Sequence, residues 1–245
     1  MNLRLLSFGI LACTMAAVAT GCNDAPGKPK ADADTVRPEQ VTDFATLYGQ
    51  NCAACHGDQG KNGAAISLAN PVYLAVAGPQ NIQRIIAAGV PGTMMPGFGK
   101  SVGGMLTDAQ IASLAQGLTT TWGNPGALAG QTPPAYAASA PGDAAQGQKT
   151  FVASCARCHG EDGTGKADKK NPGPLVEPEY LALISDQGLR SIIIAGKPEQ
   201  GMPDWRSAMQ GEGAHPLSDR EISDIVAWLA THRVTAPGQP YQQHP

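Results

Sequence analysis

Two copies of a Cys-x-x-Cys-His motif hold the residue types with the clearest chemistry in this 245-residue chain. The first copy runs from Cys52 to His56 and the second from Cys155 to His159. In such a motif, two thiolates one helical turn apart add to the vinyl groups of a haem, and the adjacent His ligates its iron. The spacing therefore predicts two covalently bound haem c groups, attached through Cys52, Cys55, Cys155 and Cys158 and ligated by His56 and His159.

A Cys-x-x-Cys pair has three other common uses. A redox-active disulfide of the thioredoxin kind expects a βαβ context, which the sequence lacks. A zinc site built from all four cysteines leaves both histidines unexplained. A structural disulfide within one motif closes a loop too short to constrain the unfolded chain much. The duplication of the whole five-residue signal favours haem over all three.

The motif belongs to a longer internal repeat. Several other short segments recur in the same order and at similar spacing after each motif. They are Tyr73-Leu74-Ala75 with Tyr180-Leu181-Ala182, Ala88-Gly89 with Ala195-Gly196, Met95-Pro96 with Met202-Pro203, Phe98 with Trp205, and Leu106 to Ile111 with Leu217 to Ile222. The repeat indicates one fold present twice.

The repeat also selects the second axial ligand of each iron. Met94 and Met95 are adjacent, but Met95 aligns with Met202, whereas Met94 aligns with Gly201. A thioether opposite an imidazole is a soft, neutral ligand that favours Fe(II) and raises the reduction potential. We therefore expect Met95 and Met202 to be axial ligands. The other methionines, Met94, Met105 and Met209, are interpreted as packing residues.

Helix signals dominate each copy, and no alternating strand pattern is present. Asp43 and Asp143 can cap a helix that leads into each motif, and Thr107 and Ser218 can cap a last helix with apolar residues at helical spacing. A middle helix, beginning near Asn81 or Asp186, ends at an Ala-Gly pair. The prediction is an all-α chain of two small tandem domains, each wrapped around one haem.

This pattern resembles the class I cytochromes c, and in particular their two-domain members, over residues 41–235. The resemblance implies six-coordinate haem, electron transfer through an exposed haem edge and no open substrate site. In that family a Pro carbonyl in a Gly-Pro-x-Leu stretch holds the haem His. Gly173-Pro174-Leu175 matches in part, but Ser67-Leu68 stands at the corresponding place, so the resemblance does not extend this hydrogen bond to His56.

The N-terminus reads as a leader with Arg4, an apolar run and small residues before Cys22. The small residues before Cys22 resemble a bacterial lipobox, with Ala19 where Leu is usual, so we expect Cys22 to be lipidated. The alternative is a plain signal peptide, which would leave a soluble periplasmic protein. The expected organisation is a signal peptide (1–21), a lipid-anchored tether (22–40), cytochrome c domain 1 (41–123), a Pro/Gly/Ala-rich linker (124–142), cytochrome c domain 2 (143–235) and a tail (236–245).

Composition excludes one class of partner. The formal net charge of −3 offers no basic footprint for nucleic acid. The predicted function is electron transfer outside the cytoplasm between redox protein partners, respiratory or other, with no catalytic residue. The alternatives are a haem-containing subunit of a larger membrane oxidoreductase complex and a dihaem peroxidase, which would need an open ligand position.

Overall fold

The computed structural model describes residues 36–166, 173–207 and 214–234. Cys22, the leader, most of the tether, Met209 and the C-terminal tail lie outside the described residues. Within the described ranges, extended pairing is limited to two isolated bridges, Gly99 with Leu106 and Lys197 with Met202. The predicted all-α class is confirmed.

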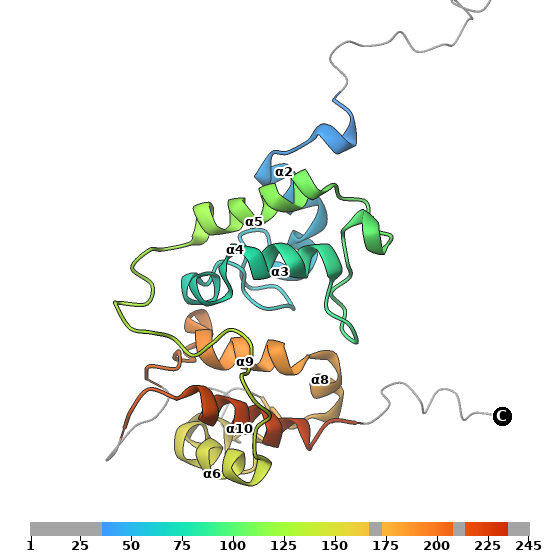
Figure 1. Ribbon diagram of the computed structural model, residues 1–245. Helices are drawn as coiled ribbons and strands as arrows, with labels where there is room; N and C mark the ends of the chain where they lie inside the picture. The colour runs from blue at the N-terminus through green and yellow to red at the C-terminus, as the bar shows by residue number, and fades with distance from the viewer. Residues whose placement is uncertain (1–35, 167–172, 208–213, 235–245) are drawn as a thin grey trace, which may run out of the picture. The chain divides into compact units, whose positions relative to one another are not determined.

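The first half of the fold follows from helix caps read in the sequence (Figure 1). Asp43 accepts a hydrogen bond from Thr46 N, and Thr107 forms a capping box with Gln110. A short helix η1 belongs to a separate N-terminal unit that ends at Gln40. The elements are η1 (Pro38–Gln40), α2 (Phe44–Asn51), α3 (Ala53–His56), α4 (Pro71–Ala88), η2 (Lys100–Val102) and α5 (Asp108–Trp122).

The main α-helices recur in the second half in the same order (Figure 1). Asp143 accepts hydrogen bonds from Ala145 N and Gln146 N, and Ser218 forms a capping box with Glu221. The elements are α6 (Ala144–Ser154), α7 (Ala156–His159), α8 (Pro178–Leu183), α9 (Asp186–Ala195), η3 (Pro198–Gln200) and α10 (Asp219–Ala230). The duplicated sequence therefore folds into two helical domains, each with a helix before the motif, a one-turn motif helix, a middle helical segment and a last helix.

In each domain a glycine lets the first and last helices approach closely. A Cβ on Gly117 of α5 would lie 2.1 Å from the Phe44 ring of α2. A Cβ on Gly147 of α6 would lie 1.9 Å from the Asp224 carbonyl oxygen of α10. The glycine lies on the last helix in the first domain and on the first helix in the second domain. Sequence alignment alone therefore does not pair these glycines.

In the first domain the middle helix resumes after a break close to Asn81, as predicted, but an unpredicted helical stretch precedes it. Helix α4 begins at Pro71 and includes a break at Gly78, whose φ is 69°. A positive φ is readily adopted by glycine and is followed here by Pro79, so the sequence signal resumes only after the break. In the second domain the break is complete: α8 and α9 are separate helices, and α9 begins at Asp186 as predicted.

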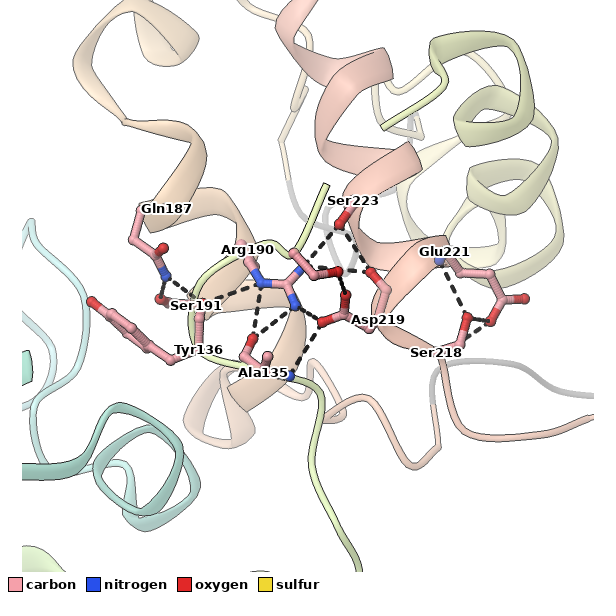
Figure 2. Close-up of polar contacts among 10 residues, drawn as sticks. Ala135, Tyr136, Gln187, Arg190, Ser191, Ser218, Asp219, Glu221 and Ser223 are labelled. Atoms are coloured by element: carbon pink, nitrogen blue, oxygen red, sulfur yellow. Dashed lines mark hydrogen bonds and ion pairs between the residues drawn. The ribbon is translucent and has the colours of Figure 1, made fainter. Parts of the chain in front are cut away.

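The linker expected at 124–142 is held to the second domain by a buried arginine (Figure 2). Arg190 is 2% exposed and its Nε donates to the carbonyls of Ala135 at 3.0 Å and Tyr136 at 3.1 Å. Its guanidinium also pairs with Asp219, which accepts a hydrogen bond of 2.9 Å from Ser139 Oγ. The guanidinium is thereby satisfied, which a buried charge requires. The linker consequently lies against α9 and α10.

This cluster predicts a loss of stability in acid. Burial raises the pKa of Asp219, but the hydrogen bond from Ser139 and the charge of Arg190 outweigh it, so the pKa lies below its ordinary value. A carboxyl group with a lowered folded-state pKa stabilises the fold above its unfolded pKa of about 4, and this contribution is lost as pH falls through the folded value. We expect Tm to fall more steeply below about pH 4 in the parent than in Asp219→Asn. Equal acid sensitivity of the two proteins would contradict this role.

Candidate functional site

The first motif occupies a single tight turn after α2. Cys52 closes α2, and its carbonyl accepts hydrogen bonds from Cys55 N at 3.2 Å and His56 N at 3.0 Å. The two thiols and the imidazole are therefore presented by one turn of helix, α3. Gly57 follows with a φ of 83°, and a Cβ there would lie 1.9 Å from the Lys61 carbonyl oxygen. Only glycine fits at this position.

The second motif has the same local geometry. The carbonyl of Cys155 accepts from Cys158 N at 3.1 Å and His159 N at 3.0 Å. Gly160 then leaves the turn with a φ of 75°. The structure thus brings together, within each domain, the three motif residues that the sequence predicts to hold a haem.

The cysteine side chains are unpaired thiols in both motifs. Burial, followed by the neighbouring thiol, raises the pKa of Cys52 to about 11 and that of Cys155 to about 12. A disulfide oxidoreductase requires a lowered thiol pKa, so this environment disfavours that alternative. Among the described residues, which include all four motif cysteines, no group of three or more His, Cys, Asp or Glu could hold a metal ion, and a shared four-cysteine zinc site is not formed.

The first motif histidine is buried and oriented. His56 is 7% exposed, and its Nδ1 lies 2.8 Å from the Ile66 carbonyl oxygen. Burial lowers its pKa, and the hydrogen bond to Ile66 opposes that shift. A carbonyl can only accept, so the neutral ring carries its proton on Nδ1 and leaves Nε2 with a free lone pair, as an iron ligand requires.

The second motif histidine is also buried but has different surroundings. His159 is 9% exposed, and burial lowers its pKa. Among the described residues none accepts a hydrogen bond from its Nδ1. The resemblance placed this bond at His159 and did not extend it to His56. The structure instead shows it at His56, whose Nδ1 donates to the Ile66 carbonyl. The acceptor is a backbone carbonyl, which any residue type supplies.

The loops that hold Met95 and Met202 also match each other in detail. Val90 N donates to the Met95 carbonyl at 3.0 Å, and Lys197 N donates to the Met202 carbonyl at 3.0 Å. The glycine that ends each preceding helix approaches that same carbonyl, as a Cβ would lie 2.8 Å from Met95 O and 2.7 Å from Met202 O. Met95 and Met202 therefore occupy equivalent places in the backbone. Both are partly buried, whereas Met94 is 80% exposed.

Aromatic contacts behind each motif were not predicted as a set. Tyr48 packs edge-on against Trp122 with ring centroids 5.0 Å apart, and Phe151 packs against Trp228 at 4.4 Å. Tyr48 also donates from its hydroxyl to the Gly57 carbonyl at 2.7 Å. Tyr48 and Phe151 occupy matching positions ahead of the two motifs, which could have identified the pair. The two tryptophans fall at different positions along α5 and α10, which the repeat hides.

The site residues fit covalent haem. One helical turn presents two free thiols and a buried, neutral histidine, and a partly buried methionine follows in a loop that begins at a glycine. Two helical domains with these features define a two-domain c-type cytochrome. Comparison with known proteins agrees. The family model described as "Cytochrome C oxidase, cbb3-type, subunit III" matches residues 39–116 and 142–229. The chain belongs to this family and has two haem c groups as cofactors.

Curated relatives extend the comparison. The chain is 29% identical over 209 residues to "Cbb3-type cytochrome c oxidase subunit FixPc" of Rhizobium leguminosarum bv. viciae, covering 81% of this chain and 63% of the relative. It is 30% identical over 199 residues to the CcoP subunit of Azospirillum sp. (strain B510), covering 75% and 59%. Cytochrome c-554(547) of Halothiobacillus neapolitanus is 28% identical over 97 residues, which are 37% of this chain and 97% of that protein. The chain thus spans less than two thirds of the length of the first two relatives.

Proposed function

We propose that the chain is an electron carrier outside the cytoplasm, with no substrate chemistry of its own. Cys52 and Cys55 attach one haem through thioether bonds, and Cys155 and Cys158 attach the other. The observation that carries the proposal is the duplicated turn that presents two thiols and a buried, neutral histidine together. When bound, each haem supplies a one-electron Fe(II)/Fe(III) couple.

The protein's own side chains set the axial ligands. When haem is bound, His56 and His159 would hold the irons through their imidazole nitrogens, and Met95 and Met202 would hold them through their sulfurs. Donation from His56 Nδ1 to the Ile66 carbonyl orients the imidazole and increases the basicity of Nε2. The uncharged methionine sulfurs favour Fe(II), which raises both potentials. With both axial positions filled, neither domain offers an open position to a substrate, so we assign no catalytic residue.

A membrane oxidase complex is the second setting that we propose. Two relatives are named as subunits of cbb3-type cytochrome c oxidase. In that setting the chain would relay electrons to a redox partner inside the complex. Affinity purification from gently solubilised membranes separates the two settings: co-elution of an oxidase with the chain supports a fixed subunit, whereas isolation of the chain alone supports a free carrier.

Membrane attachment is proposed to occur through lipid on Cys22. Among the described residues, no helix is long and apolar enough to cross a membrane. The support for a lipid anchor is the sequence Ala19-Thr20-Gly21-Cys22 after an apolar run. We expect Cys22→Ser to move the protein from the membrane fraction to the soluble fraction, because lipidation supplies the apolar anchor. Unchanged fractionation would indicate that a partner complex holds the chain instead.

Electron transfer itself is tested with the purified holoprotein. Dithionite should reduce both haems, and an added oxidised acceptor protein should reoxidise both in single-electron steps. The reduced protein should leave its spectrum unchanged under carbon monoxide, since both iron positions are filled. Rapid carbon monoxide binding to one haem would instead indicate an open site and favour a peroxidase.

A further inference from the structure

A buried asparagine connects the two haem domains. Asn70 caps α4: its Oδ1 accepts from Val72 N at 3.0 Å and from Tyr73 N at 3.2 Å. Its Nδ2 donates to the carbonyls of Ala195 at 3.0 Å and Gly196 at 3.2 Å, at the end of α9. Asn70 is 4% exposed. The amide oxygen of this one buried side chain thus accepts hydrogen bonds within the first domain, and its amide nitrogen donates hydrogen bonds to the second.

One end of this bridge lies close along the chain to Ile66, the hydrogen-bond partner of His56, and the other end lies close to Met202. On the first domain's side, Asn70 follows the segment in which the Ile66 carbonyl accepts from His56. On the second domain's side, Gly196 opens the loop of Met202, and a Cβ on Gly196 would lie 2.7 Å from the Met202 carbonyl oxygen. The bridge therefore connects residues 66–70, here called the proximal loop of domain 1, with residues 196–202, here called the distal loop of domain 2.

The second copy of the repeat shows that capping alone does not explain Asn70. Pro71 and Pro178 occupy the first turns of α4 and α8, which places Glu177 where the first copy has Asn70. Glu177 is exposed and makes no capping hydrogen bond with its side chain. The buried asparagine is specific to the copy whose helix start meets the other domain. The positive end of α4 there faces the last carbonyls of α9, a favourable dipole arrangement.

A second polar connection supports the same contact (Figure 2). The backbone carbonyl of Tyr136 in the linker accepts from Gln187 Nε2 at 2.8 Å and Arg190 Nε at 3.1 Å, both on α9. The Tyr136 phenol and the Tyr73 phenol on α4 lie close enough to influence each other's pKa, and burial raises the pKa of both. The linker thus joins α4 to α9 beside the Asn70 bridge.

We propose that Asn70 is a positioning residue that locks the proximal loop of domain 1 to the distal loop of domain 2 and thereby fixes the separation across which an electron passes between the haems. The proposal rests on the proposed function, because it requires both haems. Asn70 contacts no reacting atom; it acts through the two loops that it joins.

The test uses holoprotein with Asn70→Ser. Serine caps a helix about as well as asparagine but is too short to reach both α9 carbonyls, so the cap is kept and the bridge is lost. Asn81→Ala is the matched control: Asn81 lies on the same helix and donates only within it, to the Ala77 carbonyl. Asn70→Asp also keeps the cap but turns the bridging donor into an acceptor that repels the two carbonyls.

Two measurements are made on each variant. Flash photoreduction followed by absorbance relaxation gives the rate of electron transfer between the haems, and hydrogen exchange gives the protection of residues 195–206. We expect both Asn70 variants to slow the transfer severalfold and to speed exchange in residues 195–206, while Asn81→Ala changes neither. Parent-like rate and exchange in Asn70→Ser and Asn70→Asp would overturn the inference alone. A parent protein without interhaem transfer would overturn the proposed function, and the inference with it.

Discussion

Replacing Met95 or Met202 with alanine is expected to remove one haem's share of the methionine-to-iron charge-transfer absorption and to lower the potential of that haem. The physical reason is the loss of a neutral sulfur that favours Fe(II). The vacated position should then bind carbon monoxide when reduced and give a weak peroxidase activity absent from the parent. Absorption spectra and redox titrations of the purified variants measure these effects.

Met94→Ala is the matched control for the first domain. Met94 is adjacent to Met95 but 80% exposed, and the corresponding residue in domain 2 is Gly201. We expect this variant to keep the parent spectrum and both potentials. If Met94→Ala were the damaging change and Met95→Ala silent, the ligand would have been misplaced by one residue.

Replacing Phe151 with alanine is expected to give the largest loss of folding stability, about 3 to 5 kcal/mol. Phe151 is 1% exposed, stacks on Trp228 at 4.4 Å and lies 6.4 Å from the His159 ring, measured between centroids. Truncation would leave a cavity where the first and last helices of domain 2 meet beside the second motif. Because interiors are close-packed, the neighbouring rings cannot collapse fully into it.

Val152→Ala provides the control for that prediction. Val152 is the next residue along α6 but is 42% exposed, so its truncation should change stability by no more than about 0.5 kcal/mol. Denaturant unfolding of the two holoproteins, followed by far-UV circular dichroism, gives both values. Similar midpoints for Phe151→Ala and the parent would show that the contact between Phe151 and Trp228 does not stabilise the core of domain 2.

The sequence sufficed for the features that depend on residue type and short spacing. The two motifs predicted which thiols and histidines share a turn, and Thr107 and Ser218 were recognised as caps of the last helices. The alignment of Met95 with Met202 agrees with their matching backbone hydrogen bonds. Each of these signals is local, since it is set by helix geometry within a few residues.

Features that depend on backbone atoms or on distant contacts could not be predicted in the same way. The acceptor for His56 is a main-chain carbonyl, which leaves no mark in residue type. The part of α4 that precedes Gly78 was not predicted, because Gly78 interrupts the helical pattern with a positive φ. Asn70 was not identified from the sequence, because only the fold reveals its bond to Ala195, 125 residues further along the chain.

The central claim, that the chain is a cytochrome with two covalently bound haems, is tested most directly by the intact mass of the denatured protein. Thioether bonds survive denaturation, so the mass should exceed that of the processed polypeptide by two haems. A double Cys52→Ser and Cys55→Ser variant should lose one of them and keep the haem attached through Cys155 and Cys158. A parent mass with no haem addition, or with only one, would contradict the account.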